Sequence, residues 1–150
     1  MPEDLELGEE IPFEIVKEAW NTYRLKDGTT AKARYIQSSV FKKHVEKGLQ
    51  IFTEYQTVVS LSNVPKRDMG KPSDRSYSSE EMEEAVVEPD ITPKVMQENW
   101  NVYKLEDGTE LQVKLALAGL AKTSLYNRRG QPIYLVTTQP VVKRPRKMKP

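Results

Sequence analysis

Glu18-Ala19-Trp20-Asn21-Thr22-Tyr23-Arg24-Leu25-Lys26-Asp27-Gly28-Thr29 recurs in this chain as Glu98-Asn99-Trp100-Asn101-Val102-Tyr103-Lys104-Leu105-Glu106-Asp107-Gly108-Thr109. The two stretches are identical at 8 of 12 positions and contain both tryptophans of the chain. An ungapped match of this density predicts a duplicated structural unit. Further on, Gln56-Thr57-Val58-Val59 corresponds to Gln139-Pro140-Val141-Val142, at an offset three residues larger.

Each unit has the pattern of an antiparallel hairpin. Asp-Gly ends the first strand in both copies, and Asp-Gly is a strong hairpin signal. After the second Asp-Gly, Leu111, Val113, Leu115 and Leu117 alternate with polar or small residues, as in a strand with one buried face. The predicted fold class is therefore all-β, with two tandem homologous antiparallel units. They form either two small barrels of the SH3-like type or two halves of one shared sandwich.

Charge and proline content predict the segments around these units. Residues 1–14 and 78–90 each carry six acids and no base, whereas residues 143–149 carry five bases and no acid. Ser78 and Glu81 fit a capping box, which predicts a short helix within the polar stretch between the units. The predicted organisation is an acidic leader (1–12), a first β repeat (13–62), a flexible linker (63–93), a second β repeat (94–142) and a basic, disordered tail (143–150).

Two local features leave their structure open. Residues 39–48 are either part of a turn region or a short helix that Ser39 caps and Gly48 ends. Pro140 lies inside an apparent strand and cannot donate a hydrogen bond to a neighbour, so this strand has an edge or a bulge there.

The length of the Asp-Gly turn decides which face of the hairpin is buried, because a slip of one residue reverses every side chain. A two-residue loop would aim Arg24 and Lys104 into the core, at a cost of several kcal/mol for each unpaired charge. A three-residue loop instead buries Tyr103 and Leu105 with the leucines and valine of the next strand. We therefore predict the three-residue loop, with the glycine in the left-handed conformation. Residues 25–29 resemble the hairpin of Sm-like and other small β-barrel RNA-binding proteins over these five positions, and the chemistry of an Asp-Gly turn accounts for the likeness.

In this register both tryptophans lie outside the core, beside basic residues. A tryptophan among cations stacks nucleic-acid bases or holds a cation. Alternatively, it packs under the stems of its basic neighbours, or against the other repeat or a partner chain, and repetition in both copies favours such a packing role. The candidate interface or binding residues are Trp20, Arg24, Lys32, Arg34, Trp100, Lys104 and Lys114.

Composition excludes several functional classes. The chain has no cysteine, and His44 is its only histidine, so thiolate sites and cysteine nucleophiles are absent and a transition-metal site is not expected. No catalytic, cofactor-binding or metal-binding residues are predicted, and no membrane span or secretory leader is expected. We expect a non-enzymatic, cytoplasmic binding or assembly protein that forms a homo-oligomer or has a protein partner. The alternative is a nucleic-acid-binding protein that uses the tryptophan faces and the basic tail; the net charge of +1 does not favour it.

Overall fold

The computed structural model describes residues 8–46 and 48–147; the predicted leader and tail therefore lie partly outside it, at residues 1–7 and 148–150. The described chain is mostly β, as predicted. Its strands are β1 (Glu9–Ile11), β2 (Phe13–Lys17), β3 (Asn21–Arg24), β4 (Thr30–Val45), β5 (Gly48–Ser62), β6 (Val86–Glu88), β7 (Lys94–Gln97), β8 (Asn101–Leu105), β9 (Thr109–Tyr126) and β10 (Pro132–Lys147).

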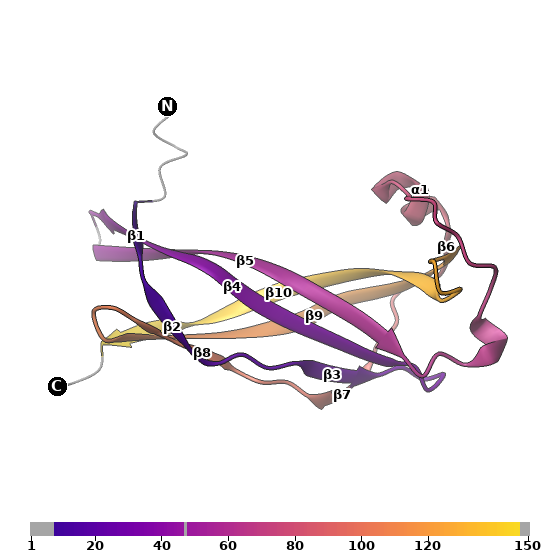
Figure 1. Cartoon of the computed structure of the whole chain (residues 1–150), viewed down its shortest axis with the longest axis horizontal. Helices are drawn as coiled ribbons and strands as arrows, with labels where there is room; N and C mark the ends of the chain where they lie inside the picture. The colour runs from indigo at the N-terminus through magenta and orange to yellow at the C-terminus, as the bar shows by residue number, and fades with distance from the viewer. Residues whose placement is uncertain (1–7, 47, 148–150) are drawn as a thin grey trace.

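The strands form two antiparallel sheets, each built on one long hairpin. In sheet A, β4 pairs with β5 on one side and with β1 and β3 on the other, and β7 pairs with β3. In sheet B, β9 pairs with β10 on one side and with β8 and β6 on the other, and β2 pairs with β8. Figure 1 shows the two long hairpins lying across one another, with their tips at opposite ends of the molecule.

Each sheet contains a strand from the other half of the sequence. The early strand β2 joins sheet B, where Ile15 pairs with Tyr103. The later strand β7 joins sheet A, where Val95 pairs with Tyr23. Ile15 and Val95 are as far apart in sequence as the two tryptophans are, and so are Tyr23 and Tyr103. The exchange is therefore reciprocal.

Both Asp-Gly turns have the predicted three-residue loop. In the first turn, the Leu25 amide donates to the Thr29 carbonyl at 2.8 Å, and Gly28 has a φ of 98°. In the second turn, the Gly108 amide donates to the Leu105 carbonyl at 3.0 Å, and Gly108 has a φ of 85°. A three-residue loop with glycine in the left-handed region continues the ladder without a slip.

The register buries the predicted inner face. Within the described residues, the two sheets share one core and form no closed barrel, so the small-barrel alternative is wrong and the shared arrangement holds. Strand exchange explains the absence of separate barrels. A repeat whose first strand pairs in the other sheet cannot form a closed barrel of its own. The buried cluster consists of Tyr23, Ala31, Ala33, Tyr35, Val40, Tyr103, Leu105, Leu111, Val113 and Leu115, with Leu117 packed against it.

Residues 39–46 and Gly48 are not helical, so the helix alternative there is wrong. Residues 39–45 continue β4, and β5 begins at Gly48. A register shift between Gln37 and Ser39 changes which side chains of β4 point inward. Val40 then lies in the core with no exposed area. A helix over these residues would have removed this core contact and the ladder with β5.

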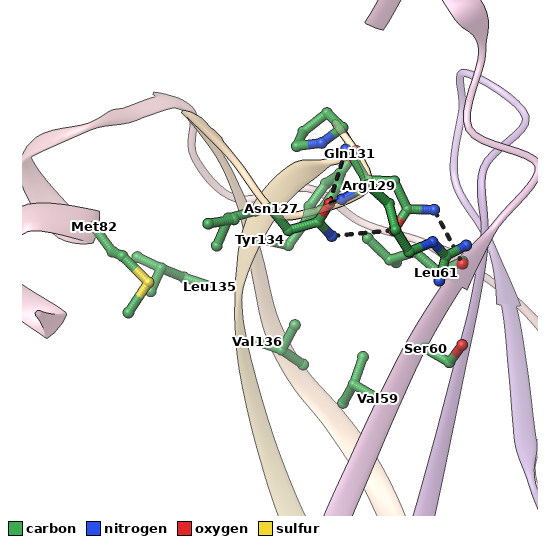
Figure 2. A pocket seen from close by; sticks show the side chains of 12 residues that line it. Val59, Ser60, Leu61, Met82, Asn127, Arg129, Gln131, Tyr134, Leu135 and Val136 are labelled. Atoms are coloured by element: carbon green, nitrogen blue, oxygen red, sulfur yellow. Dashed lines mark hydrogen bonds between the residues drawn. The ribbon is translucent and has the colours of Figure 1, made fainter. Parts of the chain in front are cut away.

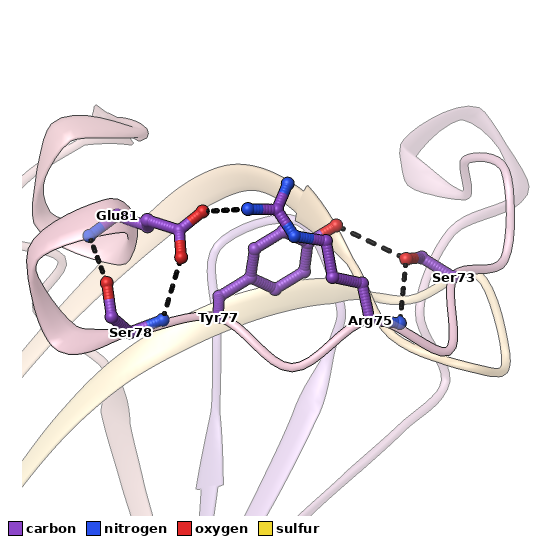
Figure 3. A network of polar contacts seen from close by, with 5 residues as sticks. All are labelled: Ser73, Arg75, Tyr77, Ser78 and Glu81. Carbon is purple, nitrogen blue, oxygen red and sulfur yellow. Dashed lines mark hydrogen bonds and ion pairs between the residues drawn. The ribbon is translucent and has the colours of Figure 1, made fainter.

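The segment between the repeats is attached to sheet B. The predicted helix is present as α1 (Ser79–Glu84), and Ser78 and Glu81 form the capping box. Figure 3 shows the polar contacts before α1, in which Tyr77 lies beside Ser73 and the Arg75 guanidinium pairs with the Glu81 carboxylate. Upstream, a 3₁₀ turn (Lys66–Asp68) leads to Gly70.

The β9–β10 turn holds the middle of this segment. The Gly70 amide donates to the Gly130 carbonyl at 2.8 Å, and the Ser73 amide to the Asn127 carbonyl at 3.0 Å. A Cβ on Gly70 would lie 2.4 Å from the Tyr126 ring, so only glycine fits against that ring.

Strands β5 and β10 are the outer strands of the two long hairpins. Pro140 lies in β10, which pairs only with β9 among the described residues, so the predicted edge is confirmed. The backbone of β10 continues to Lys147, five residues past the boundary that we predicted. Strand β5 likewise pairs only with β4 in the described chain.

Candidate functional site

Alternation along β3 and β4 gives sheet A a basic outer face. Because Ala31, Ala33 and Tyr35 point into the core, Lys32 and Arg34 point outward. Arg24 is exposed on β3, and Lys94 of the exchanged strand β7 pairs with it. We call this surface face A, and its residues are Trp20, Arg24, Lys32, Arg34 and Lys94.

The other outward neighbours on face A are neutral. Thr30, Lys32 and Arg34 of β4 pair with residues of β5, and Thr22 of β3 pairs with a residue of β7. These partners are Ser62, Ser60, Val58 and Gln97. The positive charges of this part of the sheet are therefore not neutralised by acidic strand neighbours.

Arg34 and Trp20 form the centre of face A. The Arg34 guanidinium lies 5.8 Å from the centroid of the Trp20 ring, and Trp20 is 36% exposed. A Glu18 oxygen lies 3.5 Å from Arg34, and the Glu18 side chain is only 6% exposed. The Nε atom of Arg34 is buried without a hydrogen-bond partner in the described chain. The carboxylate thus holds the arginine against a tryptophan that remains partly exposed.

Sheet B presents an equivalent surface, face B, formed by Trp100, Lys104, Lys114 and Lys143. The ammonium groups of Lys114 and Lys143 lie 5.2 Å and 4.4 Å from the centroid of the Trp100 ring. Lys104 is exposed on β8, but its strand neighbours are Glu14 and Glu110. The positive charge of face B is therefore partly offset by acidic neighbours at Lys104, unlike that of face A at Arg24 and Lys32.

A reciprocal set of hydrogen bonds between the two halves of the chain positions both tryptophans. The Ala19 amide donates to Asn101 Oδ1 at 3.0 Å, and the Asn99 amide donates to Asn21 Oδ1 at 2.8 Å. Asn99 Nδ2 also donates to the Trp20 carbonyl at 3.0 Å. Residues on each side of the tryptophans are therefore bound to the opposite half of the chain.

Two tyrosines complete this network. Tyr103 donates to Glu18 at 2.8 Å, and Tyr23 donates to Glu98 at 2.7 Å. Burial, together with the adjacent carboxylate, raises the pKa of each tyrosine well above its ordinary value. The hydroxyls therefore remain protonated and keep donating. The repeated Glu18 and Glu98 therefore connect the two halves of the chain, and Glu18 also pairs with Arg34 of β4 in its own half.

A charged pocket of about 360 Å³ lies beside the first Asp-Gly turn. Lys122 is 3.6 Å from Asp68, and Asp27 lies in the same pocket. Burial acts to raise the pKa of Asp27, but hydrogen bonds from Thr29 and the charge of Lys122 bring it below the ordinary value. Burial raises the pKa of Tyr134 in this pocket to about 12. Within residues 8–46 and 48–147, no three acidic or histidine side chains are grouped to hold a metal ion.

A second cleft opens between the edges of the two sheets. It has a volume of about 540 Å³ and lies where β5 approaches the start of β10. Figure 2 shows Val59 and Val136 on its two walls, with Met82 of α1 at one side and Arg129 above. Gln131 Nε2, in the β9–β10 turn, donates to the Leu61 carbonyl of β5 at 3.4 Å and so connects the two hairpins beside the cleft.

The structure thus divides the predicted site residues into two groups. Trp20, Arg24, Lys32 and Arg34 lie together on sheet A, and the remaining three lie on sheet B. Sequence reasoning missed Lys94, because strand exchange leaves no local signal. It also missed the contact of Lys143 with Trp100. The sequence match of residues 58–59 with 141–142 had indicated that β10 is the counterpart of β5 in the second repeat.

Comparison with models of known protein families, with characterised proteins and with solved structures found no match to this chain. Among the described residues, no helix is both long and apolar enough to cross a membrane.

Proposed function

We propose that this chain is a non-enzymatic binding protein and that single-stranded nucleic acid is the ligand of its outer sheet faces. One observation supports this most directly: on face A, a tryptophan that is 36% exposed lies beside Arg34, which Glu18 pairs with, and near Arg24, Lys32 and Lys94, whose strand neighbours carry no acid. Face B repeats the arrangement of a tryptophan beneath cations.

The chemistry of face A suits a flexible anionic strand. Arg24, Lys32 and Lys94 offer mobile charges to phosphates, and Trp20 offers an aromatic surface to an unstacked base. Stacking on an aromatic side chain contributes about 1–3 kcal/mol per base and tolerates any sequence. A single strand exposes its bases for such contacts, whereas a duplex keeps them stacked inside. Little sequence preference and strong salt dependence are therefore expected.

The test is fluorescence anisotropy of a labelled single-stranded 20-mer, titrated with the protein at several salt concentrations. We expect the logarithm of the association constant to fall linearly with the logarithm of salt, by about 0.7 for each phosphate neutralised. The double variant Arg24→Glu/Lys32→Glu should lose at least tenfold in affinity. Binding that is insensitive to salt would contradict the proposal.

A matched control separates face A from charge in general. Arg67→Glu/Lys71→Glu makes the same change in net charge at exposed positions of the linker. It should keep the wild-type affinity. Equal losses in the two double variants would show that overall charge, and not face A, governs binding.

Protein assembly, the other binding function expected from the sequence, involves different residues. The observation that favours it is the open edge of β5.

A further inference from the structure

Strand β5 is a long edge that lacks the usual protections. It spans Gly48–Ser62 and, in the described part of the chain, pairs along one side only. It contains no proline, and Glu54 is its only charged residue. Natural edge strands are normally guarded by charges, prolines, bulges or short length, because their free backbone groups recruit other strands.

The corresponding strand β10 carries those protections. Pro140 and Pro145 lack amide donors, and Lys143 adds charge near the end of the strand. Three register shifts interrupt its pairing with β9, whereas the pairing of β5 with β4 has one, between Gln37 and Ser39. The contrast between two strands in equivalent positions singles out β5.

The inner face of β5 is also apolar and partly uncovered. Tyr55 and Val59 pair with Gln37 and Ala33, whose side chains are buried, yet each is 40% exposed. Sheet B therefore does not reach across the edge of sheet A. Figure 2 shows Val59 among the side chains that line the cleft between the sheets.

We infer that β5 pairs with β5 of a second copy of this chain, antiparallel and about a two-fold axis. Residues 55–62 contain no charge in a chain that is 30% charged, so this stretch lies against a copy of itself without repulsion. The prolines of β10 disfavour pairing of β5 with β10, which would produce open filaments. An isologous contact closes as a dimer.

Glu54 does not oppose this arrangement. In a register centred on Val58, Glu54 of one copy lies opposite Ser62 of the other. The two Glu54 carboxylates are then about 27 Å apart at the strand rise of about 3.4 Å per residue, well beyond the Debye length of about 8 Å at physiological salt. The apolar stripes of the two copies meet at the centre of the contact.

The test is the mass of the full chain in solution, measured by light scattering and sedimentation over a range of concentrations. Wild type should be a dimer, and Val59→Lys should raise its dissociation constant at least tenfold, because each lysine enters the contact. The control is Val142→Lys on β10. Val142 is 49% exposed and pairs with the buried Val113, just as Val59 pairs with the buried Ala33. It should remain dimeric.

A second variant keeps the test independent of the removed valine. Thr57→Lys adds a charge at an exposed position of the same stripe and should also give monomers, with an unchanged circular dichroism spectrum. A monomeric wild type, or a Val59→Lys variant that stays dimeric, would overturn the inference. None of these residues belongs to face A or face B, so nucleic-acid binding and dimer formation fail or succeed separately.

Discussion

Three buried tyrosines and the half-buried Tyr134 give the protein a specific response to alkaline pH. Burial raises the pKa of Tyr35 and Tyr134 to about 12, and raises it for Tyr23 and Tyr103 as well. In the unfolded chain, a tyrosine loses its proton near pH 10. Between that pH and the folded pKa, the folded state holds protons that the unfolded state has released, so the free energy of unfolding falls as pH rises.

We therefore expect stability from these tyrosines to be fully present below about pH 10 and to decline progressively above it. Urea unfolding followed by tryptophan fluorescence at pH 8 to 11 measures this. A free energy of unfolding that stays constant up to pH 11 would show that the hydroxyls are not held as described.

The hydroxyl of Tyr103 has a separate energetic role. It is the donor of one of the two reciprocal bonds to a buried carboxylate, here Glu18. Tyr103→Phe should lower the free energy of unfolding by about 1.5–3 kcal/mol, the usual contribution of a hydrogen bond to a charged group. Tyr77→Phe, at a half-buried position near α1, is the control and should cost much less. Equal losses would contradict a special role for the carboxylate.

Leu115 tests the core assignment directly. It is 2% exposed at the centre of the shared core, and its carbonyl accepts a bond from Asn21. Leu115→Ala should cost about 2–5 kcal/mol through lost burial and an unfilled cavity. Chemical denaturation measures the loss, and Leu135→Ala on the partly exposed cleft wall should cost less. A loss below about 1 kcal/mol at Leu115 would mean that it does not form part of a tightly packed core.

At this scale, much of the local structure was predictable. The cost of burying Arg24 or Lys104 was sufficient to select the turn length, and the turn length selected the core residues. The tyrosine partners of Glu18 and Glu98 were not predictable, because each lies in the opposite half of the chain and no local pattern identifies it.

Among the elements, the linker depends on one glycine. Gly70 lies against the Tyr126 ring, where a Cβ would come within 2.4 Å. Gly70→Ala should therefore displace this part of the linker from the β9–β10 turn and break the bond to Gly130. Hydrogen exchange of the Gly130 region and limited proteolysis should both report the release.

A second glycine provides the contrast. Gly28 has a positive φ, but a Cβ there would meet no atom within 4 Å. Gly28→Ala should cost about 1–3 kcal/mol from backbone strain alone and leave the linker protected. If the Gly28 variant released the linker as readily as the Gly70 variant, packing against Tyr126 would not be the reason.

The short helix α1 was predictable because its signal is local: a serine cap and a glutamate three residues later. The length of β4 and β5 was not predictable from the same kind of signal. The lysines and the histidine near their tip resemble an exposed helix, whereas the ladder with β5 and the packing of Val40 in the shared core show the strand to be correct.

For the whole molecule, the exchange of β2 and β7 makes the two halves inseparable in the folded state. A protease site inserted after Ser76, an exposed linker position, would divide the chain into two fragments. After cleavage, we expect the native mass and the tryptophan fluorescence to be unchanged, because β2 still pairs with β8 and β7 with β3. Fragments that separated without denaturant would contradict the exchange.

During synthesis, neither sheet can be completed until strands from the second half of the chain have been made. When the first half has left the ribosome, its sheet still lacks β7, and β2 has no strand to join until β8 arrives. Contacts between residues so far apart in sequence form slowly. The inner face that carries Tyr23 and Tyr35 therefore stays uncovered until β8 and β9, which supply the other side of the shared core, have been made. During this interval the chain is most exposed to aggregation or to capture by a chaperone.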